Sequence, residues 1–320
     1  MEKIHLSHYP LVSICIPAHN AGKYIKDTIN SVLAQTYKNI EIIIVDDNST
    51  DETNALIQSF GTLNISLIFQ GSGGAAGARN NAFNHSKGQY IKFLDGDDLI
   101  DPEMIENQIN LALQNEQCVI SAKWGRFYDD DLRTFQLSPE NCWRTLPAVE
   151  WICSSWENGS SMMQAGLFLI PRKIIEQVGL WNSALTLIDD LEFFTKVILG
   201  AEMVVFDENS TLYYRSGNVS SLSNRRTKEA VHSSFLAIEM ATRKLLALDS
   251  TTKSRLACAN VWQHFIYDNY PRYPELRVAA QSRIDEYGGS SLQYMCGGMT
   301  KAMVSLIGWK ITCRIKEWLK

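Results

Sequence analysis

The chain has 320 residues, and its 30 lysines and arginines against 35 aspartates and glutamates give a net charge of −5. This slightly acidic balance excludes a dedicated nucleic-acid binder, which usually presents a strongly basic surface, so no nucleic acid is expected among the partners. The length is sufficient for one large or two modest domains.

The cysteines and the hydropathy pattern indicate the compartment. The 7 cysteines contain no Cys-x-x-Cys pair and are odd in number, which favours reduced thiols over a disulfide framework or a zinc site. Residues 1–10 lack the apolar segment of a secretory signal. No apolar run reaches the roughly 20 residues of a membrane-spanning helix. We expect a cytoplasmic protein, either free or peripheral on the inner face of the plasma membrane.

Strand-like and helix-like segments alternate at the start of the chain. Apolar runs predict strands at 11–16, 40–45, 65–69 and 90–94. Helical spacing follows at 21–35, from the capping residues 48–51 to about 60, at 75–85, and from 102 to about 113. This order predicts an α/β fold with a mostly parallel sheet flanked by helices. Ligands of such sheets bind at the carboxyl ends of the strands.

The second half of the chain is less regular until it becomes helical. We expect a strand at 166–170, helices at 171–178 and 189–199, and short strands at 203–206 and 211–214. Helical patterns then cover 225–247, 252–268 and 272–286, with a last segment through 319. The predicted domains are 1–222, with halves of about 10–115 and 116–222, and a helical C-terminal region at 223–320.

The most informative motif is Asp95-Gly96-Asp97-Asp98, directly after the strand at 90–94. Like charges gathered at a strand end are unfavourable unless a cation compensates them. A divalent metal bound by carboxylate oxygens, itself holding a phosphorylated ligand, is the simplest such partner. The alternative is a solvated turn with a helix cap, for which Asp98 or Asp101 before Pro102 is suited. A cap needs only one acid, and Asp98 is the candidate structural member of the cluster. The cluster therefore predicts a metal and nucleotide-diphosphate site.

Two further acidic groups each allow two interpretations. Asp46-Asp47-Asn48-Ser49-x-Asp51 ends a strand and would contact a base or ribose, or it starts a helix with Ser49 or Asp51 as the cap. The pair Asp189-Asp190 begins a predicted helix, where acids complement the macrodipole. A buried carboxylate near a nucleotide would also serve as a general base, although the chemistry alone favours the dipole explanation.

A glycine-rich loop suggests a different enzyme class. Gly71-Ser72-Gly73-Gly74-Ala75-Ala76 is close to the dinucleotide-binding fingerprint, with Asp95 about twenty residues further on. The loop follows the third predicted strand rather than the first, which weakens this interpretation. An NAD(P)-dependent oxidoreductase is therefore the second hypothesis. Arg79 in the next helix would reach a phosphate or base, or pair with a nearby aspartate.

Taken in order, the motifs resemble one known family. Segments 12–20, 31–37, 41–51 and 77–82, the Asp95 cluster and the Asp189-Asp190 pair resemble family 2 glycosyltransferases of GT-A fold over about residues 10–215. The resemblance implies an inverting, metal-dependent enzyme that moves one sugar from a nucleotide-sugar, most often UDP-linked, to an acceptor hydroxyl. The acceptor would be a saccharide or a lipid-linked molecule in cell-surface polysaccharide or glycolipid assembly.

The resemblance also implies site residues. It assigns the nucleotide-sugar site to Pro17, His19, Asn20, Asp47, Arg79 and Asp95. Asp97, with Asp95, matches the Asp-x-Asp pair that binds Mn²⁺ or Mg²⁺, and Asp190 matches the catalytic base. Two positions depart from the family: His19 stands where tyrosine is usual, and Gly217 where a histidine often follows the arginine. The Gln-x-x-Arg-Trp motif is absent, which favours a non-processive, bacterial-type hexosyltransferase.

Two segments and a third hypothesis complete the predictions. The tryptophan- and serine-rich stretch 143–166 is interpreted either as the acceptor side or as core. Segment 303–320 has apolar residues at helical spacing with basic residues elsewhere. This pattern predicts either an interfacial helix on anionic lipid or a helix that docks on protein. In the second case the partner would be the same domain or another subunit, in a homodimer through the C-terminal helices. A non-catalytic nucleotide-sugar-binding relative is the third hypothesis, and the presence of all three acidic groups speaks against it.

Overall fold

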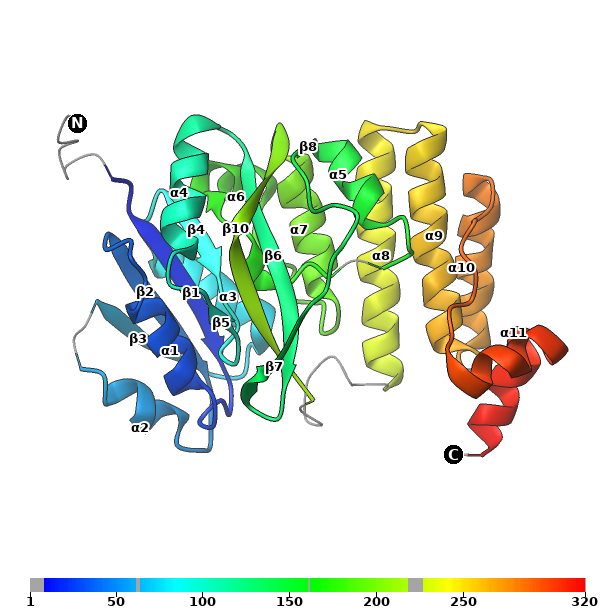
Figure 1. Ribbon diagram of the computed structural model, residues 1–320, viewed down its shortest axis with the longest axis horizontal. Coiled ribbons are helices and arrows are strands. Elements are labelled where there is room, and N and C mark those ends of the chain that lie inside the picture. Colours follow the sequence, from blue (N-terminus) through cyan, green and yellow to red (C-terminus); the bar gives the residue numbers. More distant parts are fainter. Residues whose placement is uncertain (1–8, 62–63, 161, 218–226, 320) are drawn as a thin grey trace.

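The computed structural model describes residues 9–61, 64–160, 162–217 and 227–319. Two β-sheets with their covering helices form one part of the molecule, and the C-terminal helices stand in a row beside it (Figure 1). The predicted boundary at 222/223 lies outside the described residues.

The first sheet is mostly parallel, as predicted. Its strand order is β3-β2-β1-β4, with the short β9 (Ile170–Pro171) antiparallel at the edge. The parallel strands are β1 (Val12–Ala18), β2 (Ile40–Asp47), β3 (Ile65–Gln70) and β4 (Tyr90–Phe93). The crossover helices are α1 (Ile25–Leu33), α2 (Thr53–Gln58) and α3 (Gly74–His85). Strands β1 and β2 are almost wholly buried, which explains their continuous apolar runs.

The second sheet contains strands that the sequence pattern did not predict. Its order is β5-β10-β6-β7, and β8 (Leu146–Pro147) also pairs with β10. The strands are β5 (Leu99–Ile100), β6 (Val119–Tyr128), β7 (Asp131–Leu137) and β10 (Met203–Ser216). The two strands expected at 203–206 and 211–214 are one strand, whose pairing with β6 shifts register between Asp207 and Thr211. The polar residues at that irregularity divided the apolar pattern in two.

The strand expected at 166–170 is mostly wrong. A 3₁₀ turn at Ala165–Leu167 replaces its first two residues, and only Ile170 enters β9. Gly166 packs where a Cβ atom would lie 2.6 Å from a methyl carbon of Leu212 and 3.0 Å from one of Leu94. The chain here lies between the two sheets: Leu169 forms an isolated bridge with Ile120 of β6, and Ile170 pairs with Ile91 of β4.

The helices of the second half agree with the predictions to within a few residues. They are α4 (Met104–Gln114), α6 (Arg172–Val178), α7 (Asp189–Leu199), α8 (Lys228–Leu248), α9 (Thr252–Asn269), α10 (Pro274–Tyr287) and α11 (Gly298–Trp318), with α5 (Ala148–Ser155) not predicted. The buried apolar residues of α8, α9 and α10 belong to the same core cluster as those of the two sheets, and polar contacts also join the two parts. For example, the Asn260 side chain on α9 donates a 2.9 Å hydrogen bond to the carbonyl of Glu157.

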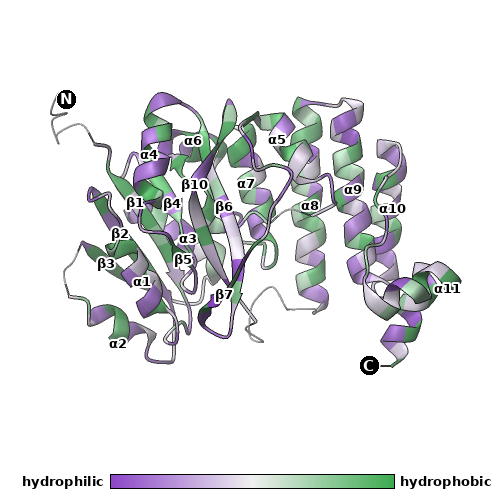
Figure 2. Ribbon diagram, viewed as in Figure 1, coloured by the Kyte–Doolittle hydropathy of each residue, from purple (hydrophilic) through white to green (hydrophobic). Residues whose placement is uncertain are grey.

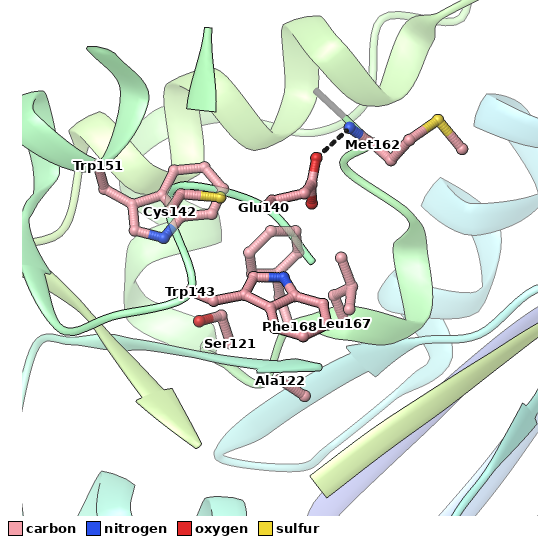
Figure 3. Close-up of a pocket in the computed structure, with 9 residues that line it drawn as sticks. All are labelled: Ser121, Ala122, Glu140, Cys142, Trp143, Trp151, Met162, Leu167 and Phe168. Atoms are coloured by element: carbon pink, nitrogen blue, oxygen red, sulfur yellow. Dashed lines mark hydrogen bonds between the residues drawn. The ribbon is translucent and has the colours of Figure 1, made fainter. Parts of the chain in front are cut away.

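The tryptophans of segment 143–166 belong mainly to the core. Trp156 is fully buried and Trp151 is 4% exposed. Trp143 and Trp151 line a closed cavity of about 10 Å³ beside Glu140, whose carboxylate accepts a hydrogen bond from the backbone N–H of Met162 (Figure 3). Such a cavity has room for about one water molecule and none for a sugar. The core interpretation of Trp151 and Trp156 is therefore the correct one.

Candidate active site

The loops that follow β1 and β2 are joined at one edge of the first sheet. The Nδ1 atom of His19 lies 2.7 Å from the carbonyl oxygen of Asp47, and its Nε2 atom lies 3.2 Å from Nδ2 of Asn20. The Asn20 amide oxygen accepts the N–H of Thr50 at 2.8 Å. Asn20 has φ 48°, a left-handed conformation that asparagine tolerates. His19 and Asn20 therefore lie exposed at one rim, next to the buried Asp47.

The acidic turn after β4 reaches the same rim. A Cβ atom at Gly96 would lie 3.1 Å from the carbonyl oxygen of Pro17, so a side chain here would crowd the end of β1. The structure thus brings Pro17 together with Asp95 and Asp97. Parallel strands place their carboxyl ends at one edge, which is where ligands of such sheets bind.

Asp47 caps helix α3 from the end of β2. Its Oδ1 atom accepts the N–H of Gly73 at 2.6 Å and an amide N–H of Gln70 at 2.9 Å, and its Oδ2 atom accepts the N–H of Gly74 at 2.9 Å. The loop amides that a dinucleotide pyrophosphate would need are therefore already bonded within the protein. This arrangement weighs against the oxidoreductase hypothesis, and it gives Asp47 a structural role in addition to the predicted contact with nucleotide.

We expect Asp47→Ala to destabilise the protein by about 1–2 kcal/mol, because it removes the acceptor of two N–H groups at the start of α3. Urea unfolding followed by circular dichroism measures this change. Glu176→Ala is the control, since Glu176 is exposed on α6. A variant at Asp47 as stable as this control would contradict the capping role.

Asp98 and Arg215 fix the backbone of the acidic turn. Asp98 is 1% exposed, and its Oδ1 atom accepts the N–H of Arg215 at 3.0 Å. The Arg215 side chain returns a hydrogen bond from Nε to the carbonyl oxygen of Asp97 at 2.8 Å. Its guanidinium also lies 4.6 Å from the ring centre of Tyr24 and 4.7 Å from that of Phe127. Asp98 is thus the structural member of the cluster.

Asp97 is the carboxylate of this turn that remains free for a ligand. Burial, together with the neighbouring charge of Asp95, raises the pKa of Asp97 to about 6, and Arg215 opposes the shift. A hydrogen bond from its own backbone N–H and the charge of Arg79 also lower this pKa, but they do not offset the effect of burial. A bound cation would relieve this unfavourable charge.

Arg79 links the acidic turn to the start of α7. It is 7% exposed, and its Nη2 atom lies 2.6 Å from Oδ1 of Asp95 while Nη1 lies 3.2 Å from Oδ2 of Asp189. Its guanidinium stacks 4.4 Å from the ring centre of Trp181. Of the alternatives for Arg79, pairing with nearby aspartates is the one that this geometry shows, and it joins two predicted groups of site residues.

Asp190 occupies the first turn of α7 next to this bridge. Burial, with a further contribution from the charge of Asp189, raises the pKa of Asp190 to about 7, and Arg79 opposes the shift. Ile188, just before the helix, has φ 50° and ψ 33°. That left-handed conformation is unfavourable for a β-branched residue, and such strain concentrates at functional sites. A carboxylate with this pKa is suited to accept a proton near neutral pH.

The carboxylates fit a metal that shares its ligands with a substrate. In the described part of the chain, no three His, Cys, Asp or Glu side chains are close enough to hold a metal ion alone. Mg²⁺ is usually bound by one or two carboxylates with substrate phosphates and water completing its shell. Asp97 and Asp95 match that donor set.

Two polar residues near the turn escaped the sequence prediction. Gln164 is 4% exposed, and both polar atoms of its amide lack a partner within the described structure. Arg126 donates to the hydroxyl of Ser216 at 2.9 Å and lies 5.1 Å from the ring centre of Tyr214. Gln164 lies within the stretch 143–166 that the sequence marked, but no pattern singled out its amide. Arg126 was not marked, because its position depends on the unpredicted strand β6.

The sequence matches the family model described as "Glycosyl transferase family 2" over residues 13–179, just over half of the chain. An uncharacterized glycosyltransferase of Rickettsia typhi is 28% identical over 257 residues, which cover 78% of this chain and 79% of that protein. The Escherichia coli UDP-Glc:alpha-D-GlcNAc-diphosphoundecaprenol beta-1,3-glucosyltransferase WfgD is 41% identical over 118 residues, covering 37% of this chain and 46% of WfgD. The chain spans 40% and 41% of the length of two further Rickettsia glycosyltransferases, from R. felis and R. conorii.

Among solved structures, the crystal structure of S. aureus TarS in complex with UDP-GlcNAc has a TM-score of 0.69 to this chain at 16% sequence identity. The similarity covers 87% of this chain and 80% of the crystallised TarS chain, which comprises residues 1–349 of that protein. At this identity the likeness establishes the fold, which is the predicted GT-A type followed by a helical region.

Proposed function

Because the chain belongs to glycosyltransferase family 2, we propose that it transfers one sugar from a nucleotide-sugar, with UDP as the nucleotide, to an acceptor hydroxyl with inversion at the anomeric carbon. The observation that carries this proposal is the Arg79 bridge, which holds Asp95 2.6 Å from one nitrogen and Asp189 3.2 Å from the other. A pair of carboxylates suited to a metal and diphosphate therefore lies close to the carboxylate suited to be the base.

In the proposed reaction, Asp190 accepts the proton of the acceptor hydroxyl as its oxygen attacks the anomeric carbon and the bond to the diphosphate oxygen breaks. Mn²⁺ or Mg²⁺, when bound by Asp97 and Asp95, supplies positive charge that stabilises the departing diphosphate. Arg79 fixes the turn relative to α7, so that donor and acceptor are held in line. The free-energy barrier is lowered by positioning as well as by charge.

One relative supports a UDP-sugar donor and a lipid-linked acceptor. The related E. coli enzyme is named for transfer from UDP-Glc to a diphosphoundecaprenol-linked sugar. We extend the same classes of donor and acceptor to this chain, with a role in cell-surface polysaccharide or glycolipid assembly. A homodimer through the C-terminal helices stays a prediction. A cytoplasmic location, with residues 303–320 in contact with the membrane, also stays a prediction.

The experiment that tests this function is a panel of UDP-, GDP- and dTDP-sugars incubated with the purified protein and Mn²⁺ and assayed for slow hydrolysis. Release of UDP from one UDP-sugar, abolished by a chelator, is the expected result. Release of no nucleoside diphosphate from any donor, also in the presence of undecaprenyl-diphosphate-linked sugars, would contradict the proposal.

Activity should depend on pH through Asp190. A base must be ionised to accept a proton, so kcat/KM is expected to rise with pH and to reach half of its plateau near pH 7, the raised pKa of this carboxyl. Below that pH the carboxyl is protonated and cannot act. Initial rates at fixed Mn²⁺ in buffers from acid to mildly alkaline pH measure the profile, and a flat profile through neutrality would argue for a different base.

A further inference from the structure

Helix α11 lies at the outer end of the molecule, near the C-terminus (Figures 1 and 2), and several of its large apolar side chains are exposed. Met299 is 87% exposed, Leu306 83% and Trp318 84%. In the described part of the chain, no helix carries an apolar stretch of the length and hydrophobicity needed to cross a bilayer. A membrane-spanning role therefore does not explain these exposed apolar side chains.

The apolar side chains of α11 form two short stripes. Gly308 has φ 77° and ψ 158°, which divides the helix into segments 298–307 and 309–318. Apolar residues recur at i, i+4 and i+7 in each segment, and this spacing places them on one side of a helix. The stripes are Met299, Met303 and Leu306 in the first segment, and Ile311, Ile315 and Trp318 in the second.

The other side of the second segment is packed on the helical region. The Trp309 ring lies 4.9 Å from that of Tyr267 and 5.0 Å from that of Tyr270. Thr312 and Cys313 are buried on the same side. The second stripe therefore faces outward because the opposite side of the helix is anchored in the fold.

Positive charge accompanies the stripes, although the whole chain is acidic. Glu317 is the one acidic residue of α11, and its Oε1 atom accepts a 2.6 Å hydrogen bond from Nε of Arg272. Its charge is thus compensated by an arginine outside the helix. Of the basic residues of α11, Lys310 and Arg314 flank the second stripe. Lys301 and Lys316 lie on the side of the helix away from the stripes, and Lys316 donates to the hydroxyl of Thr300 at 3.4 Å.

We propose that α11 docks on an anionic lipid surface, with its exposed apolar side chains among the acyl chains and with Lys310 and Arg314 at the phosphate headgroups. A low net hydrophobicity combined with an apolar side and flanking cations is typical of helices that lie in the membrane interface. Anionic leaflets attract such basic segments. A second copy of the chain would cover the apolar side chains but would bring the same positive charge against itself. The inference rests on the side chains of α11 and not on the proposed function.

Flotation with lipid vesicles tests the surface without any activity assay. The full chain is expected to float with vesicles of phosphatidylglycerol and phosphatidylcholine, and to bind phosphatidylcholine alone at least about tenfold more weakly. Leu306→Ser combined with Trp318→Ser should abolish flotation. Lys310→Gln combined with Arg314→Gln should weaken it about tenfold and reduce its sensitivity to salt.

The control is Val278→Ser, which removes a 70% exposed apolar side chain from α10 and should leave flotation unchanged. Circular dichroism of each variant shows that the fold is retained. Equal binding to both vesicle types, or no binding to either, would overturn the proposal. Light scattering measures whether the wild-type protein is a dimer. The proposal would also be overturned if the Leu306 and Trp318 changes converted such a dimer to a monomer but left flotation unchanged.

Discussion

Replacing Asp190 with asparagine is expected to lower kcat by about 10³-fold, within the range that general bases contribute. The amide has nearly the same shape as the carboxylate but cannot accept the proton of an attacking hydroxyl. Its Oδ1 atom can still accept the 2.9 Å hydrogen bond from the N–H of Leu191, so the start of α7 should keep its structure. Steady-state rates with the best donor from the panel measure the loss, and calorimetry should show nearly unchanged nucleotide-sugar binding.

Asp189→Asn is the matched control for that experiment. It removes a charge one residue away and weakens the 3.2 Å ion pair with Arg79, but it leaves the proposed base in place. We expect a much smaller loss of kcat, together with an altered pH profile, because the charge of Asp189 contributes to the raised pKa of Asp190. Full turnover in the Asp190→Asn protein would reject the assignment of the base.

Asp97→Ala is expected to act on binding instead. Removing a metal ligand should weaken Mn²⁺-dependent nucleotide binding by about 100-fold, at least as much as changes in the outer shell of metal sites do. The backbone carbonyl of Asp97 still accepts the hydrogen bond from Arg215, so the turn should persist. Calorimetric titration with UDP in the presence and absence of Mn²⁺ separates the two contributions.

Without metal, the weak binding of UDP should be the same in wild type and in the Asp97→Ala variant. Glu176→Ala, an exposed change on α6, is the control for handling and stability. Wild-type affinity of the Asp97→Ala protein for UDP and Mn²⁺ would show that the metal, if bound, is held by other groups.

The sequence predicted β3 and β4, although β3 is only partly buried and Lys92 lies within β4. It predicted β1 and β2 most clearly, because both are almost wholly buried and mostly apolar. It missed β6 for the opposite reason. Lys123, Gly125 and Arg126 interrupt that strand, although most of its residues are buried. The strand β7 is partly exposed throughout, so its pattern resembles that of a loop. The apolar pattern therefore identified the parallel strands of the first sheet. It missed β6 and β7, where polar or partly exposed residues interrupt the apolar runs.

Strand-end acids were predictable one by one, but their connections were not. Arg79 and Asp189 are 110 residues apart in the chain, and Asp98 and Arg215 are 117 apart. No periodicity reports contacts of that range. The sequence left Asp190 with a helix-dipole explanation on chemistry alone, and only its resemblance to a family raised it above that. The fold adds its position beside the Arg79 bridge, which is the physical reason to propose it as the base.

The most direct measurement is calorimetric titration of the purified protein with UDP, GDP and dTDP, each with and without Mn²⁺. Saturable heat from UDP that requires the metal is the predicted result, since the aspartates around Asp97 are then balanced by a dication and a diphosphate. Absence of heat from every one of these nucleotides, with the protein folded, would contradict a metal–diphosphate site.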